Sequence, residues 1–146
     1  DFRNDGADPA ADSLDGSTYT IGLVRQWGSV ADFVDDFQFS VDGQWADLRG
    51  DNQAYYGCFA IVSATCPIWE CWELCPEAGI GFRTYPDFVG APSRDETIWR
   101  AGAEMRRWLS DHRFVSGTFY YDRFDSGNAE FAAERFTAGA SLTLLH

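Results

Sequence analysis

The sequence predicts an all-β protein, built as an antiparallel up-and-down meander of about seven to eight strands. Apolar and polar residues alternate with a period of two through most of the 146 residues, which is the pattern of a strand with two different faces. Aromatic residues reach 16% and favour strands, while clusters of Gly, Pro, Asp, Asn and Ser divide the alternation into segments. No run of about 18 apolar residues is present, so the sequence predicts no transmembrane helix.

Residues 1–16 are predicted to form an acidic N-terminal tail or loop, followed by one β domain over residues 17–146. The first segment holds five Asp together with Pro, Gly and Ala, but few large apolar residues. The spacing of these Asp residues does not match that of a calcium-binding EF-hand loop. The chain begins at Asp1 without an initiator Met or a signal-peptide pattern, from which we expect a processed or partial product.

Seven segments show the strand pattern, in which apolar residues lie on one face and polar residues on the other. They are residues 18–27, 32–47, 54–65, 72–85, 97–109, 113–124 and 131–145. The segment at 54–65 alternates less cleanly and is expected to be buried. The second segment alternates over the greatest length, with Phe37, Phe39 and Val41 opposite Gln38 and Ser40. A helix would scatter these residues over several faces.

Two of the segments carry a feature that argues against a regular strand. Pro76 lies inside 72–85 and cannot donate a ladder hydrogen bond, so we expect a bulge there or a later start of the strand. Residues 97–109 are rich in Ala, Glu, Met and Arg, which are good helix formers. Their alternation, with Trp99 and Trp108 near the two ends, favours a strand over a helix.

The connections between the predicted strands differ in length. Short turns are predicted at residues 28–29, 49–52, 67–70 and 110–112, and longer loops at 86–95 and 125–130. Short turns on one rim and longer loops on the other are typical of outer-membrane barrels. The sequence therefore predicts a β-barrel, or the C-terminal part of one, with the lipid bilayer as its partner.

Charged residues gather on the polar face of the later strands, and these are the candidates for residues that face a lumen. They are Glu73, Glu77, Arg83, Arg100, Glu104, Arg106, Asp122 and Arg135. We expect Arg100, Glu104 and Arg106 to form a ladder of ion pairs on this face. A soluble β-sandwich would show the same alternation, with its charged face toward water and its apolar face in the core.

Two details of the apolar face favour a bilayer over a soluble core. Many of its residues are small and would fill a soluble core poorly. They include Ala101, Ala103, Gly117, Ala138 and Ala140. Aromatic residues also gather near the predicted strand ends, as they do in the interfacial girdles of membrane barrels.

Four cysteines, Cys58, Cys66, Cys71 and Cys75, lie within 18 residues. An even number so close together predicts one or two disulfides and an oxidising compartment. Their connectivity stays open, although Cys66 and Cys71 flank the predicted turn at 67–70 and could bridge a hairpin. The spacing lacks the paired C-x2-C knuckles of zinc sites, so no metal is predicted.

The composition and the motifs point away from nucleic acid and from an enzyme. The net charge is −12 and all 11 basic residues are Arg, which gives no basic surface for phosphates. Ser110, Asp111 and His112 are neighbours in sequence, which does not give the geometry of a catalytic triad. No nucleotide-binding or nucleophile-elbow motif is present, so we predict neither a catalytic residue nor a cofactor.

Several short motifs mark the C-terminal half of the chain. They are Arg83-Thr84-Tyr85, Ser93-Arg94-Asp95, Trp108-Leu109-Ser110, Tyr120-Tyr121-Asp122-Arg123 and Glu134-Arg135-Phe136. With them, residues 81–144 resemble the last strands of bacterial outer-membrane β-barrel porins. The resemblance implies an antiparallel barrel in the outer membrane without catalytic residues. Members of that family are longer and lack the cysteine cluster, and such chains tend to end in an aromatic residue, whereas this one ends in Leu144-Leu145-His146.

Three classes of function follow from this reading. The first is a barrel of the bacterial outer membrane with a passive-transport (porin-like) or structural role. The second is a soluble β-sandwich or lipocalin-like binding module, secreted or periplasmic. The third is a β-rich assembly subunit whose edge strands pair with a second copy or with a partner chain. An odd strand count of seven would favour the third class, because closed single-chain bacterial barrels have even counts.

Overall fold

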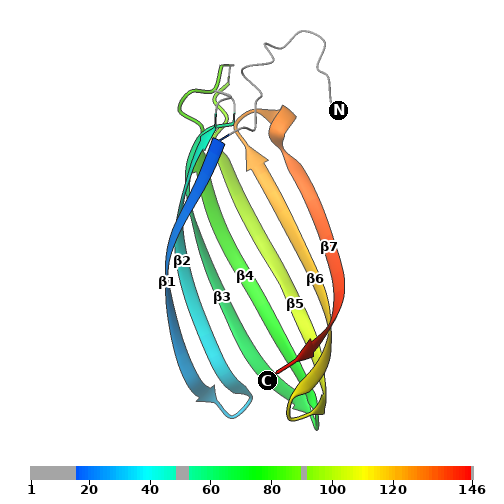
Figure 1. Ribbon diagram of the computed structural model, residues 1–146. Coiled ribbons are helices and arrows are strands. Elements are labelled where there is room, and N and C mark those ends of the chain that lie inside the picture. The colour runs from blue at the N-terminus through cyan, green and yellow to red at the C-terminus, as the bar shows by residue number, and fades with distance from the viewer. Residues whose placement is uncertain (1–15, 49–52, 90–91, 146) are drawn as a thin grey trace.

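The computed structural model describes residues 16–48, 53–89 and 92–145, which form one antiparallel sheet of seven strands (Figure 1). The strands are β1 (Gly16–Ala31), β2 (Val34–Leu48), β3 (Tyr55–Trp69), β4 (Trp72–Thr84), β5 (Glu96–Ser110), β6 (Arg113–Ser126) and β7 (Ala133–Leu144). They lie in sequence order, and each pairs antiparallel with the next. The predicted all-β meander is confirmed, and residues 97–109 belong to a strand and not to a helix.

The described connections differ in length between the two ends of the sheet (Figure 1). Residues 32–33, 70–71 and 111–112 make tight turns at one end, which we call the turn rim. The connection between β4 and β5, and residues 127–132 with the 3-10 helix η1 (Ala129–Phe131), lie at the other end, the loop rim. The predicted separation of short turns from longer loops is present, while the turn predicted at 49–52 lies outside the described residues.

The first turns lie further along the chain than the sequence predicts. β1 continues through Gly28 and Ser29, where the register shifts and Ser29 takes a φ of 22°. The predicted turn is therefore a bulge within a longer strand. β3 likewise runs through Pro67 to its end at Trp69, and the chain turns at residues 70–71, where Cys71 has a φ of 65°.

Pro76 is a strand residue, paired with Ala103 of β5. On its other side, the described β3–β4 ladder passes from the pair Ser63–Glu77 to Cys66–Leu74 without a pair at Pro76. A proline has no N–H to donate, so it weakens the ladder on one side. The predicted irregularity is therefore present, but β4 does not start late.

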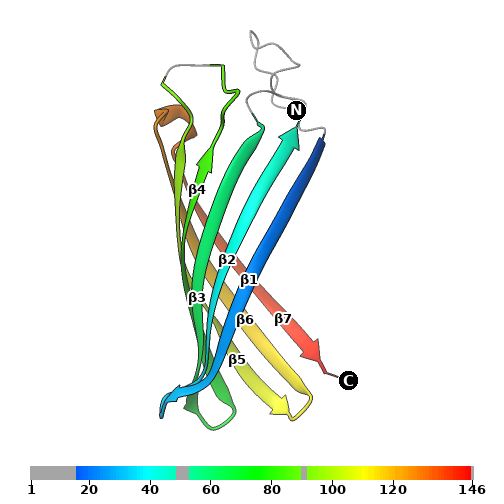
Figure 2. The same ribbon diagram turned by 90° about the vertical axis from the view of Figure 1, so that its left-hand side faces the viewer.

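The sheet is curved and its strands are tilted, but it does not close (Figures 1 and 2). Within the described residues, β1 pairs with β2 alone and β7 with β6 alone. The predicted barrel is thus seen as an open, curved sheet with two free edges. The described part of the chain contains no helix of the length and apolarity needed to cross a bilayer.

Very little of this sheet is buried within the chain. The buried apolar residues of the described part are Ala46, Tyr85 and Ile98. Large apolar side chains are instead exposed along most strands; Ile21 and Leu23, for example, are 80% and 81% exposed. A second sheet packed on this one would give a sandwich core, but the described strands form a single layer.

Candidate functional site

All eight of the charged residues predicted to share a face do so. Strand residues alternate between the two faces, and the cross-strand register connects the polar positions of one strand to those of the next. We call this side the hollow face, because two hollows lie on it. The first, about 300 Å³, is lined by Asp36, Gln38, Ser63, Thr65, Cys75, Glu77, Glu104, Arg106 and Tyr120, among others. The second, about 400 Å³, is lined by Glu77, Arg100, Tyr120, Asp122, Arg135 and Thr137.

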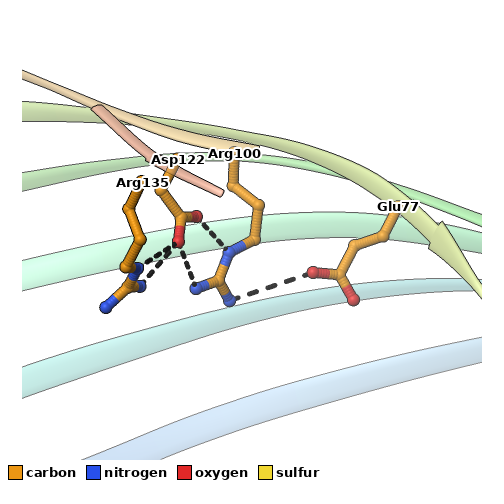
Figure 3. Close-up of polar contacts among 4 residues, drawn as sticks. All are labelled: Glu77, Arg100, Asp122 and Arg135. Carbon is orange, nitrogen blue, oxygen red and sulfur yellow. Dashed lines mark hydrogen bonds and ion pairs between the residues drawn. The ribbon is translucent and has the colours of Figure 1, made fainter. Parts of the chain in front are cut away.

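A row of three charged residues crosses β5, β6 and β7 in the middle of the hollow face. Arg100, Asp122 and Arg135 are direct cross-strand neighbours in the register. The Asp122 carboxylate accepts a hydrogen bond from Arg100 Nε at 2.7 Å and another from Arg135 Nη2 at 2.6 Å. Arg100 also reaches Glu77 of β4, with 3.9 Å between Nη1 and Oε1 (Figure 3). Four strands are thus connected by ion pairs whose side chains point to the same side of the sheet.

A second group of ion pairs lies nearer the turn rim. Arg106 donates to the carboxylate of Glu104, two residues before it on β5, at 2.6 Å. The other side of the guanidinium lies 4.0 Å from Glu73 of β4. The hydroxyls of Ser116 and Ser141 are hydrogen bonded at 2.9 Å in the same cross-strand row. Of the expected ladder, the pair Arg106–Glu104 is present, whereas Arg100 pairs with Asp122 and Glu77 and not with Glu104.

Arg83, the last of the eight, lies at the loop-rim end of the hollow face. It is the cross-strand neighbour of Glu96, and its guanidinium lies over the ring of Tyr55, 4.7 Å from the ring centre. The candidates thus fall into three places along one face, and the sequence pattern placed all eight on that face.

The opposite face carries an apolar band that crosses all seven strands. The band consists of alternate residues within 19–27, 37–45, 56–66, 74–82, 99–105, 115–121 and 136–144. Charged residues of this face stand at the ends of the band, toward either rim: Asp35, Asp47, Arg107, Arg113, Arg123, Asp125 and Glu134. Within the band the one charged residue is Arg25. Its guanidinium lies over the ring of Trp27, which is the next residue on this face toward the turn rim.

Aromatic rings lie in rows at the edges of this band. Near the loop rim, Tyr19, Trp45 and Tyr56 are cross-strand neighbours, with ring centres 5.6 Å and 6.3 Å apart. Toward the turn rim, Trp27 and Phe37 have ring centres 5.7 Å apart. The expected enrichment of aromatic residues near strand ends is therefore present on β1 to β3.

At the loop rim, four residues from two connections and the first residue of β5 pack together, and we call them the loop latch: Tyr85, Phe88, Arg94, Glu96 and Phe131. The guanidinium of Arg94 lies between the rings of Tyr85 and Phe131, 4.1 Å and 4.0 Å from their centres. Glu96 accepts hydrogen bonds from Arg94 Nε at 2.9 Å and from the Tyr85 hydroxyl at 3.0 Å. Phe88 meets Phe131 edge to face. The latch fixes the β4–β5 connection against η1.

The loop latch was not predicted from the sequence. Its members come from segments more than 30 residues apart, and no local periodicity connects them. The available signal was three aromatic residues, Tyr85, Phe88 and Phe131, which lie in or directly beside the two predicted loops at 86–95 and 125–130.

Burial raises the pKa of Tyr85 to about 12, and the neighbouring Glu96 carboxylate acts in the same direction. An unfolded tyrosine ionises near pH 10. The folded chain therefore holds the phenol in its protonated form, which contributes stability below about pH 10 that is lost as the pH rises toward 12. We expect the tyrosinate absorbance of the wild type minus that of Tyr85→Phe to show one phenol that ionises near pH 12. Ionisation of that phenol near pH 10 would contradict the burial of Tyr85.

The comparisons with known proteins do not assign this chain to a family. Comparison with protein-family models, with curated proteins and with solved structures finds no match. The geometry of the two faces therefore carries the functional argument, and the porin resemblance stays a prediction from sequence.

The four cysteines, Cys58, Cys66, Cys71 and Cys75, are all free thiols, so the structure does not contain the predicted disulfides. Cys58 and Cys66 share a face of β3 but are eight residues, about 26 Å, apart along it. Cys75 lies on the hollow face, where its thiol is 3.9 Å from the Thr65 hydroxyl, and so faces away from Cys66. Cys71 is part of the turn that Cys66 was predicted to flank. Among the described residues, no group of His, Cys, Asp or Glu is arranged to hold a metal ion.

Proposed function

We propose that this chain forms the wall of a bacterial outer-membrane β-barrel, with a passive-transport or structural role. The observation that carries the proposal is the apolar band. An exposed surface that crosses seven strands and holds a single charged residue, with other charges at its two ends, has the layout of a lipid-facing barrel surface. Exposed apolar patches of this extent are unusual on soluble monomers.

The strand lengths suit a bilayer. A transmembrane β-strand needs about 9–11 residues when tilted by about 45°. The strands here have 12 to 16 residues, so each spans the hydrocarbon layer with a few residues left at the headgroups. The aromatic rows at the edges of the band would then lie at the two interfaces, where Tyr and Trp are favoured.

The hollow face supports an aqueous interior. Its ion pairs Arg100–Asp122 and Arg106–Glu104 would be costly against hydrocarbon, but they are stable beside water. In a barrel the face opposite the lipid lines the lumen, so these pairs would stand along a solvated path. In the proposed barrel the eight polar candidates would face the lumen.

A second candidate is an assembly subunit, and the free edges favour it. All the described residues of β1 are exposed except Ala31, and β7 is exposed except for Thr143. Unpaired strand edges of this length are templates for pairing with another chain. A secreted or periplasmic binding module is less well supported, because its apolar face would need a covering layer.

Partitioning tests the proposal directly. We expect the natively expressed protein to fractionate with detergent-extracted outer membrane and to migrate faster on SDS gels before boiling than after it. A folded barrel resists SDS until it is heated, which is the reason for the shift. A protein that is soluble and monomeric without detergent, with no shift on boiling, would refute the membrane assignment and leave the soluble binding module.

A further inference from the structure

We infer that the aqueous path along the hollow face prefers small cations over anions. This inference rests on the proposed function, since it needs a solvated lumen. The observation that carries it is an unequal distribution of charge on the hollow face. In the described strands this face holds Asp36, Asp42, Glu73, Glu77, Glu96, Glu104 and Asp122, against Arg83, Arg100, Arg106 and Arg135.

Three of the four arginines of this face are paired with carboxylates, and the fourth, Arg83, lies over the Tyr55 ring as the cross-strand neighbour of Glu96. Arg100 and Arg135 share Asp122, and Arg100 also reaches Glu77. Arg106 lies between Glu104 and Glu73. A guanidinium held by a carboxylate contributes little net field to a passing ion, because the two charges largely cancel beyond their own separation.

The other half of the hollow face has no such compensation. On β1, β2 and β3 the charged residues of this face are Asp36 and Asp42, and both are acidic. Asp36 accepts a hydrogen bond from Gln26 at 2.9 Å, which orients the carboxylate without neutralising it. Asp36 lines the first hollow together with Glu77 and Glu104, where Arg106 is the one cation among the lining residues.

The loop rim has the same sign as the hollow face. Its described acidic residues include Asp47, Asp87, Asp95, Asp125, Glu130 and Glu134, and its described arginines beyond the hollow face are Arg94 and Arg123. A cleft whose walls carry one sign of charge raises the local concentration of the opposite ion. The effect is a property of the summed charge and needs no ion bound at a fixed site.

Reversal potentials in planar bilayers under a potassium chloride gradient test the inference. We expect a potassium-to-chloride permeability ratio above 1, on the order of 3. The double variant Asp36→Asn/Asp42→Asn should bring the ratio closer to 1. The matched control compares single variants at adjacent positions of β2: Asp36→Asn removes a charge from the hollow face and should lower the ratio, whereas Asp35→Asn removes one from the opposite face near the turn rim and should leave the ratio unchanged.

The outcomes separate the inference from the function on which it rests. Channels with no preference, or with a preference for chloride, would overturn the inference and leave the barrel in place. Equal effects of Asp36→Asn and Asp35→Asn would also overturn it, because the hollow face would then not be the conducting path. A protein that shows the shift on SDS gels but gives no conductance would refute passive transport, and the cation preference with it, and leave a structural barrel.

Discussion

The substitution Ala78→Arg is expected to lower the free energy of unfolding in lipid vesicles by about 2–4 kcal/mol. Ala78 lies on the exposed face of β4, in the middle of the apolar band, with Val62 and Ala101 as its cross-strand neighbours. A guanidinium there would have to leave water and enter hydrocarbon, where the described neighbours offer it no partner. Denaturant unfolding of the protein refolded into vesicles measures the loss.

Ser63→Arg is the matched control for this substitution. Ser63 lies on β3, on the hollow face, directly across from Glu77. An arginine there would meet a carboxylate and water, so we expect a change below about 1 kcal/mol. Equal losses from Ala78→Arg and Ser63→Arg would show that lipid does not cover the apolar band.

Asp122→Ala is expected to destabilise the fold by about 2–3 kcal/mol. Asp122 is 1% exposed and accepts hydrogen bonds from two guanidiniums on neighbouring strands. Its removal leaves Arg100 and Arg135 side by side as like charges without their shared acceptor. We expect a smaller loss of stability than is usual when one partner of a fully buried ion pair is removed. The reason is that the Arg135 side chain is 57% exposed, so water replaces part of the interaction.

Asp125→Ala tests whether burial, and not the ion pair itself, causes that effect. Asp125 lies on the same strand and accepts from Arg123 Nε at 2.8 Å, almost the same length as the 2.7 Å between Arg100 and Asp122. This pair is exposed, so its loss should be small and should shrink further in high salt. If Asp125→Ala destabilised the fold as much as Asp122→Ala, burial would not be the cause of the larger effect expected for Asp122.

The alternation of residues was sufficient to predict the meander and the composition of both faces. Strand side chains point to opposite sides in turn, so a residue's face follows from its position alone once a strand is assigned. Arg100, Asp122 and Arg135 could therefore be placed on one face before their contacts were known. That these three residues form a row across β5, β6 and β7 could not be predicted, because it depends on the register between neighbouring strands.

Turn positions and long-range contacts were harder to predict. Gly28-Ser29 and Pro67 are turn-forming residues, but the chain accommodates both within strands: Gly28-Ser29 as a bulge, and Pro67 as a residue paired with Glu73 just before a register shift. The cysteines were expected to pair because of their spacing, whereas the alternation of β3 and β4 sends Cys66 and Cys75 to opposite faces. The loop latch joins two connections that local sequence treats as unrelated.

The odd number of strands in the described part of the chain decides how the open sheet can be completed. Since direction reverses at every step, β1 and β7 both run from the loop rim to the turn rim. A direct junction between them would therefore be parallel, and so would a junction between two copies that share one orientation in a membrane. Antiparallel closure requires an odd number of additional strands, so that the total becomes even.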